Sequence, residues 1–186
     1  MKQTIQIPTF LHEVHGERAN PLDVILAHLF AVAVTFLTLY LSLDEGLPLI
    51  KLILLGILAY DLSGGVLANF STGTSRHYAA SAKARRNFLL LHILQPSLMI
   101  YIYQGNDLVL ALLCAFIVLG AALVNAQKEA IKQFRLGSLI SLVGLTILFI
   151  PATELTNVQT MLLAFFMLKL PLAFAVNWYA LSSKKN

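Results

Sequence analysis

Six long runs of apolar residues, separated by short polar turns, dominate the hydrophobic pattern of this chain. They cover residues 21–42, 47–70, 88–103, 108–126, 136–150 and 160–181. At 1.5 Å per residue, the first run would form a helix of about 33 Å, which is long enough to cross the hydrocarbon core of a bilayer. The pattern predicts an all-α fold, a polytopic integral membrane bundle of six transmembrane helices forming one domain over residues 21–181.

The start of the first run carries its own helix signal. Asn20 is a good N-cap residue, Pro21 suits the first helical position, and Asp23 places an acid in the first turn. Residues 1–20 before it mix apolar and charged side chains, and Pro8 prevents one continuous helix. We expect this segment to lie at the membrane interface, and residues 182–186 to form a cytoplasmic tail.

Composition supports a membrane protein. Apolar residues make up 58% of the chain and charged residues 12%, whereas soluble domains are about 25% charged. The mean hydropathy is +0.78. Cys114 is the only cysteine, which excludes disulfide frameworks and thiolate zinc sites. The pI near 9.3 does not indicate nucleic acid as a partner, because the basic residues are spread over short loops between apolar runs.

The loop charges predict the orientation. Of the 13 lysines and arginines, only Lys51 and Lys169 lie inside apolar runs. All the others fall in the two ends and in every second turn, and the turns near residues 44, 104–107 and 153–159 contain none. Because cytoplasmic loops are enriched in lysine and arginine, both termini are predicted to be cytoplasmic. The expected location is a prokaryotic cytoplasmic membrane.

The second run contains the principal candidate for a functional site. Asp61 lies at membrane depth, where an ionisable residue is costly and usually functional. Gly65 and Asn69 follow at four-residue intervals on the same helical face, and Gly64 and Gly65 would admit a close neighbour or a ligand. Counting helical rise places Lys169 near the depth of Asp61, so the two could pair. Such a pair could also serve only to neutralise two charges and to lock two helices together.

Other polar side chains fall in the same, cytoplasmic half of the predicted bundle. We expect His28 and His92 to act as proton partners of Asp61, which makes these three the candidate catalytic residues. Candidate substrate-binding residues at this depth are Asn69, Gly64, Gly65, Gln95, Lys169, Asn177 and Trp178. This one-sided distribution predicts a polar cavity that opens to the cytoplasm.

The turn after the second run is rich in hydroxyl groups and bases. Thr72, Arg76, His77 and Tyr78 are candidates for binding the polar or anionic head of a substrate, since a helix that begins near Thr74 would offer free amides. The alternative is a capped turn whose bases meet anionic lipid headgroups. The spacing is not that of a P-loop.

The combination suggests acid–base chemistry on an amphipathic small molecule, isoprenoid- or lipid-like, as in membrane terpene cyclisation. Two alternatives remain open: a proton-linked transporter of a small solute, or a non-catalytic membrane assembly subunit. No dedicated metal site is predicted, although His28 and His92 could ligate haem, or with Asp61 a divalent metal. The expected partners are the lipid bilayer and the amphipathic ligand, and the oligomeric state is left open.

Overall fold

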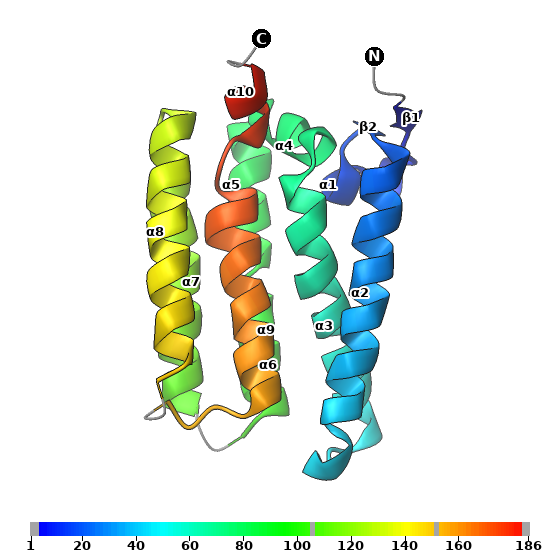
Figure 1. Cartoon of the computed structure of the whole chain (residues 1–186), viewed down its shortest axis with the longest axis vertical. Helices are drawn as coiled ribbons and strands as arrows, with labels where there is room; N and C mark the ends of the chain where they lie inside the picture. The colour runs from blue at the N-terminus through cyan, green and yellow to red at the C-terminus, as the bar shows by residue number, and fades with distance from the viewer. Residues whose placement is uncertain (1–3, 105–106, 151–152, 184–186) are drawn as a thin grey trace.

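The computed structural model describes residues 4–104, 107–150 and 153–183, which form a bundle of helices lying side by side (Figure 1). Five helices in this described part are long and apolar enough to cross a membrane. They are α2 (Pro21–Leu41), α3 (Leu49–Phe70), α7 (Asp107–Asn125), α8 (Ala130–Leu148), and α9 with its continuation (Asn157–Phe174). The predicted all-α class is confirmed, and the five helices indicate a membrane protein.

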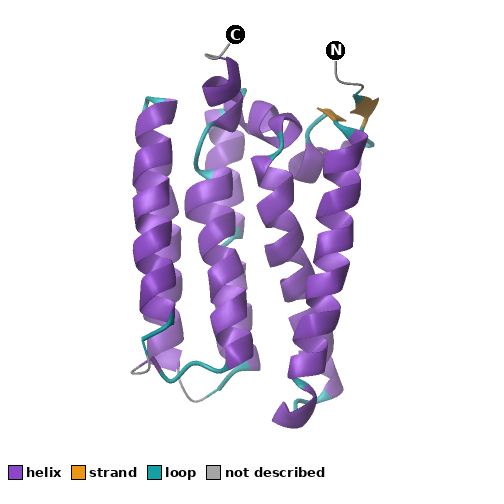
Figure 2. Ribbon diagram, in the orientation of Figure 1, coloured by secondary structure: helices purple, strands orange, loops and turns teal. Residues whose placement is uncertain are grey.

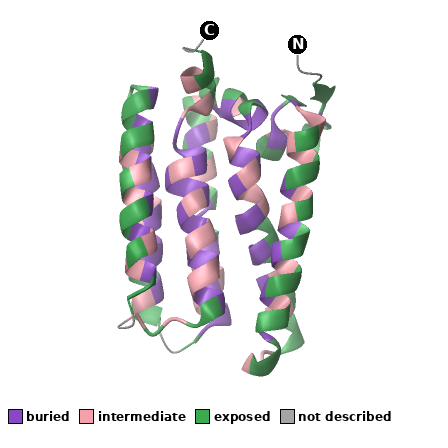
Figure 3. Cartoon of the chain, in the orientation of Figure 1, coloured by how far each residue is buried: buried purple, intermediate pink, exposed green. Residues whose placement is uncertain are grey.

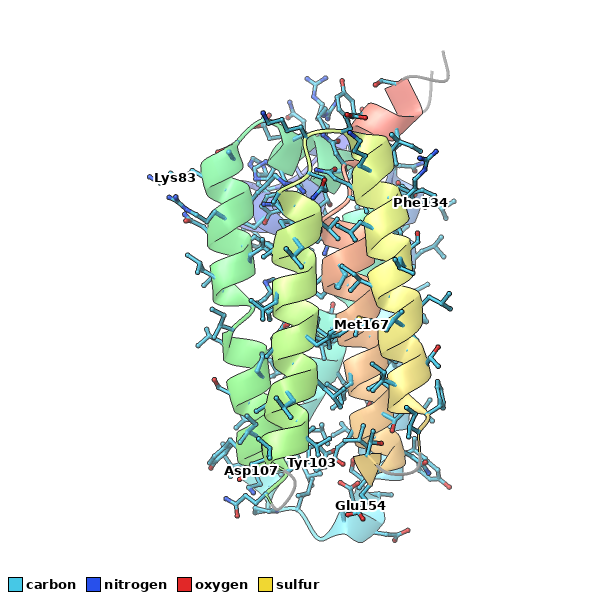
Figure 4. All side chains as sticks on the ribbon, turned by 90° about the vertical axis from the view of Figure 1, so that its left-hand side faces the viewer. Lys83, Tyr103, Asp107, Phe134, Glu154 and Met167 are labelled. Carbon is cyan, nitrogen blue, oxygen red and sulfur yellow. The ribbon has the colours of Figure 1, made fainter. Side chains whose placement is uncertain are left out.

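The third predicted run is divided into two helices, so the prediction of one helix over residues 88–103 is wrong. The two are α5 (Ala82–Leu91) and α6 (Leu94–Ile102). The break falls at His92, four residues before Pro96. Pro96 has no N–H to donate to the His92 carbonyl, and its ring clashes with that carbonyl. Lys83 lies near one end of the bundle and Tyr103 near the other, so α5 and α6 together cover its length (Figure 4).

The last predicted run is also interrupted. α9 (Asn157–Met167) begins with a capping box between Thr156 and Gln159 and continues into a π-helix, η4 (Leu168–Phe174), before the separate helix α10 (Trp178–Ser183). Pro171 cannot donate to the carbonyl of Met167, and the Ser141 hydroxyl donates to it instead at 3.4 Å. A single helix over residues 160–181 is therefore incorrect.

The N-terminal segment folds over one end of the bundle (Figure 2). β1 (Ile5–Gln6) pairs antiparallel with β2 (Arg18–Ala19), and η1 (Thr9–Leu11) and α1 (His12–His15) lie between them. α4 (Thr72–Ala79) and α10 are at the same end, and the turn η2 (Leu43–Glu45) is at the opposite end (Figure 1). Lys2 and residues 184–186 of the predicted tail lie outside the described residues.

Exposed residues lie mainly on the outward parts of the helices and buried residues on the parts that face the interior (Figure 3). Arg85, which the loop-charge argument counted among the cytoplasmic bases, is one of the buried residues. Its Nε donates to Asn125 Oδ1 at 2.6 Å, and its Nη2 donates to the carbonyl of Ala175 at 2.8 Å. This guanidinium therefore ties α5 to the ends of α7 and η4.

Candidate functional site

An ion pair links the two charged side chains that the sequence singled out within the apolar runs. Lys169 Nζ of η4 lies 2.8 Å from Asp61 Oδ2 of α3, and the side-chain amide of Gln95 on α6 donates to the same oxygen. Lys169 is 2% exposed, whereas the Asp61 side chain is 51% exposed. The structure thus forms the predicted Asp61–Lys169 pair and adds Gln95 as a third member.

Gly65 provides the path by which Lys169 reaches Asp61. A β-carbon placed on Gly65 would lie 2.9 Å from Lys169 Cδ and 3.0 Å from its Nζ, which shows that the lysine stem crosses α3 directly over this glycine. The neighbouring Gly64 has a different role, since its β-carbon would meet Ala31 Cβ of α2 at 3.0 Å. One glycine therefore admits a side chain and the other admits a helix.

Gly65→Ala is expected to push the Lys169 ammonium away from Asp61, because the flexible lysine arm yields before the backbone does. Loss of the ion pair should lower the free energy of unfolding by roughly 1–3 kcal/mol, measured by thermal or chemical unfolding in detergent. Gly56→Ala on the same helix is the matched control, since its new β-carbon would make only ordinary contacts of 3.6–3.8 Å. Equal stability of the two variants would contradict this role for Gly65.

A chain of hydrogen bonds runs beside the ion pair. The Tyr60 hydroxyl of α3 lies 2.6 Å from His28 Nδ1 of α2, and His28 Nε2 lies 3.1 Å from His15 Nε2 of α1. If Tyr60 donates to His28, the proton of the neutral His28 ring is on Nε2 and points at His15. The chain can therefore pass a proton between the neighbourhood of Asp61 and the N-terminal segment.

The ion pair and the histidine chain border one cavity of about 300 Å³. Its polar wall includes Asp61, Lys169, His28 and Asn69, and the rest is mostly apolar. The apolar part includes one residue from each of η1, α1, α2, α3 and α5, in that order: Leu11, Val14, Ala27, Ala68 and Phe88. Asn69 is 3% exposed, and its Nδ2 has no hydrogen-bond partner among the described residues. A buried amide without a partner is costly, so a small rotation of the Asn69 side chain toward a ligand oxygen in the cavity would be favourable.

The N-terminal segment forms the wall of this cavity at the end of the bundle. Thr74 Oγ1 of α4 donates to the carbonyl of Val14 at 2.6 Å. The Tyr78 hydroxyl lies 2.6 Å from Glu13 Oε2 and 2.9 Å from the Glu13 carbonyl, and burial is the main cause that raises the Tyr78 pKa. Tyr78 therefore anchors this wall as a neutral donor.

Protonation of His15 is expected to loosen the wall. Burial and, secondarily, the nearby His28 lower the pKa of His15 below its ordinary value of 6.5. The unfolded segment then binds more protons than the folded one just below pH 6.5, so the stabilisation present above pH 6.5 is lost as the pH falls. Hydrogen exchange of residues 4–19, corrected for intrinsic rates, should increase more from pH 7.5 to 5.5 in the wild type than in His15→Gln.

Several predicted site residues lie away from the cavity. Thr72 and Arg76 line a second hollow of about 500 Å³ at the end of the bundle, together with Arg18 and Asn20. The Ser71 side chain caps α4, so the helix begins before the expected Thr74. His77 Nε2 lies 3.9 Å from Glu13 Oε1, and His77 is not among the described residues that line the cavity. The predicted head-group site is therefore separate from Asp61.

The remaining candidates have structural contacts. His92 Nδ1 lies 2.7 Å from the Phe88 carbonyl, and its other ring nitrogen has no partner among the described residues. Asn177 Oδ1 accepts from the amide of Ala180, and Trp178 Nε1 donates to the carbonyl of Ala173. The contacts of Asn177 and Trp178 do not join the Asp61 cluster, whereas His92 lies close enough to Lys169 and Asp61 to interact with their charges.

The structure does not support a ligand set made of His28, His92 and Asp61. His28 contacts His15 and Tyr60, whereas His92 contacts Phe88. Among the residues that the structure describes, no three His, Cys, Asp or Glu side chains gather closely enough to hold a metal ion.

Tyr60 and His15 are the two site residues that sequence reasoning missed. Tyr60 had a usable signal, because it precedes Asp61 and lies four residues from Gly64 on the same helical face. His15 had only the spacing His12-x-x-His15, which an interfacial segment explains equally well.

Fold and site together define a helical protein whose described part contains five helices of membrane length and a partly polar cavity. No protein family, curated protein or solved structure matches this chain.

Proposed function

We propose that the chain crosses the bilayer six times with both termini in the cytoplasm. α5 and α6 would together make the third crossing, since residues 82–102 extend about 31 Å at helical rise. The first and last described elements, β1 and α10, lie at the same end of the bundle (Figure 1), which an even number of crossings requires. The alternating loop charges support the cytoplasmic side for that end.

We propose further that the cavity binds an amphipathic, isoprenoid- or lipid-like molecule and carries out acid–base chemistry on it. One observation carries this proposal: an ion pair and a hydrogen-bonded histidine chain border the same cavity, whose other lining residues are mostly apolar. A buried ion pair is seldom the most stable solution, and an apolar pair often serves stability better. Its presence beside a hollow therefore favours a functional role.

The geometry supports distinct roles for the polar residues. Asp61 would act as the base, because Lys169 and Gln95 both donate to it. Lys169 would hold the Asp61 carboxylate in place through the ion pair. Tyr60, His28 and His15 would exchange a proton with the end of the bundle, and Asn69 would orient a ligand oxygen. His92 keeps no part in this proposal beyond its packing on Phe88.

Native mass spectrometry of the purified protein tests this proposal. The wild type should carry a small lipid-like molecule. Asp61→Asn should stay folded and carry a different molecule, the unconverted substrate, since the amide keeps the shape of the carboxylate but cannot act as a base. Fragmentation of the released molecule identifies it even where substrate and product are isomers of equal mass. Leu112→Ala, at an exposed position of α7, is the control. Wild-type protein without any bound molecule would contradict the binding role, and identical ligands in both proteins would contradict the chemistry.

Proton-linked transport is the second candidate. The Tyr60–His28–His15 chain favours it, because these hydrogen bonds connect the surroundings of Asp61 with the end of the bundle. Proteoliposomes containing a pH-sensitive dye should then show proton flux driven by a candidate solute, and His28→Phe should abolish it. A protein that co-purifies in fixed ratio, with no ligand and no flux, would instead indicate an assembly subunit.

A further inference from the structure

A groove continues from the cavity along the outside of α2 and α3. Thr35 and Leu39 of α2 line it, together with Leu52, Ile53, Gly56 and Ile57 of α3. Tyr60 and Asp61 line both the groove and the cavity. Tyr60 and Asp61 therefore stand between the two hollows and are accessible from both.

A row of α3 residues lines both hollows. They recur in adjacent pairs at four-residue spacing, and since each pair is turned about 40° from the one before, the row winds around the helix. The pairs are 52–53, 56–57, 60–61, 64–65 and 68–69. From the first pair to the last, the helix rises about 24 Å. This length approaches the thickness of the hydrocarbon core, so an extended chain that follows the row would pass from the groove to the cavity beside Tyr60 and Asp61.

The two halves of this row differ in polarity. The cavity half ends at Asn69, whose buried Nδ2 needs an acceptor. The groove half has mostly apolar residues, of which Ile57 is 59% exposed. An outward-facing apolar groove in a membrane protein is open to the bilayer, and Asp61, itself half-exposed, marks the boundary. A molecule with an oxygen at one end and a hydrocarbon chain at the other matches this division.

The charges of the cavity favour an uncharged head. Among the described residues that line it, Lys169 is the only lysine or arginine, and its charge is already paired with Asp61. Glu13, at the rim, adds a negative charge. The arginines that would suit a phosphate, Arg18 and Arg76, line the separate hollow at the end of the bundle. An anionic head in the cavity would therefore lack a counter-ion.

We propose that the ligand is a single-chain amphipath with an uncharged oxygen head, an alcohol or an aldehyde, whose chain lies in the α2–α3 groove and which enters from the bilayer between these helices. The inference rests on the proposed function and narrows its substrate class. Asn69 holds the head oxygen near Asp61, and the apolar groove holds the chain.

Photolabelling of the full-length protein in phospholipid nanodiscs tests the inference. The probe is hexadecanol with a mid-chain diazirine, and labelled residues are identified by mass spectrometry. Label should concentrate on residues 35–39 and 52–57. Unlabelled hexadecanol should compete at least about tenfold better than hexadecyl phosphate, because the cavity has no free cation for the phosphate.

Gly56→Phe should fill the groove. Since each buried CH₂ contributes about 0.8 kcal/mol, excluding two of them should reduce labelling about tenfold or more. Leu112→Phe, which enlarges an exposed position of α7, should leave labelling unchanged. Ile57→Trp is a second blocking variant that keeps the α2–α3 contact at Gly56, and it should also reduce labelling.

The outcomes separate this inference from the proposed function. Label spread evenly over the lipid-facing residues, or groove labelling that neither blocking variant reduces, would overturn the groove. Equal or better competition by hexadecyl phosphate would overturn the uncharged head. In both cases a lipid-like molecule found by native mass spectrometry would leave the proposed function standing, whereas protein with no bound molecule would remove that function itself.

Discussion

Asp61→Leu is expected to lower the free energy of unfolding by about 3 kcal/mol, because removing the half-exposed carboxylate leaves the buried Lys169 charge uncompensated. Lys169 is almost fully buried in η4, and its ammonium could reach water only by leaving its place over Gly65. Gln95 would lose its acceptor as well. Thermal unfolding in detergent should show a midpoint roughly 10 °C lower than that of the wild type.

The double variant Asp61→Leu/Lys169→Leu is the decisive control. Replacing both charges with apolar side chains removes the unpaired ammonium, and such replacements are often neutral or stabilising. Most of the lost stability should return. The part that does not return is the cost of the Gln95 amide, which has lost its hydrogen-bond acceptor. Bound ligand should nevertheless be absent from this variant. A double variant as unstable as Asp61→Leu would contradict the assignment of the cost to a buried charge, and a stable one that keeps its ligand would contradict a functional pair.

The ends of the first three long helices were largely predictable because local signals set them. Asn20 accepts from the amide of Leu22 at the start of α2, as its side-chain chemistry predicts. α3 ends at Phe70, where the apolar run also ends, and α7 covers 107–125 against the predicted 108–126. Where the length of the apolar run and the capping residues agree, they set the helix ends, and tertiary contacts change them little.

Proline positions were visible in the sequence, but their effects were not. A proline in a membrane helix can kink, break or widen it, depending on which neighbours satisfy the freed carbonyl. Pro96 coincides with a break between α5 and α6, whereas Pro171 lies inside a π-helix whose freed carbonyl accepts from Ser141. Because that donor comes from another helix, the local sequence could not distinguish these outcomes.

Depth in the bundle was easier to predict than direction around each helix. Helical rise brought Asp61 and Lys169 to the same level, and the structure pairs them. His92 lies near the expected depth, but its ring stacks on Phe88 and does not meet His28. Direction depends on which helices are neighbours, and six apolar runs with similar composition do not reveal their order.

The fold of the N-terminal segment depends on contacts between residues far apart in the chain. Gly16 has a φ of +74°, and a β-carbon there would overlap the carbonyl of Gly73. This mutual fit of two glycines, one on each side of the contact, brings His15 to His28. The sequence around residue 16 gives no sign that Gly16 packs against Gly73 of α4.

Gly73→Ala is therefore expected to detach the N-terminal segment from the bundle. The added β-carbon would lie 2.6 Å from the carbonyl oxygens of both His15 and Arg18, and backbone atoms cannot rotate away as a side chain can. The hydrogen bonds from Thr74 and Tyr78 to this segment would weaken together. At about 1 kcal/mol each, their loss should speed hydrogen exchange of residues 4–19 roughly 10- to 100-fold.

The matched control is again Gly56→Ala, which makes the same substitution where the new β-carbon has ordinary contacts. It should leave the exchange of residues 4–19 unchanged. Because His15 and Glu13 line the cavity, detachment in Gly73→Ala should also open it to water and release the bound molecule, while the Asp61–Lys169 pair stays intact. Unchanged exchange in Gly73→Ala would show that the segment is held by other contacts, and faster exchange with the ligand retained would show that the segment does not close the site.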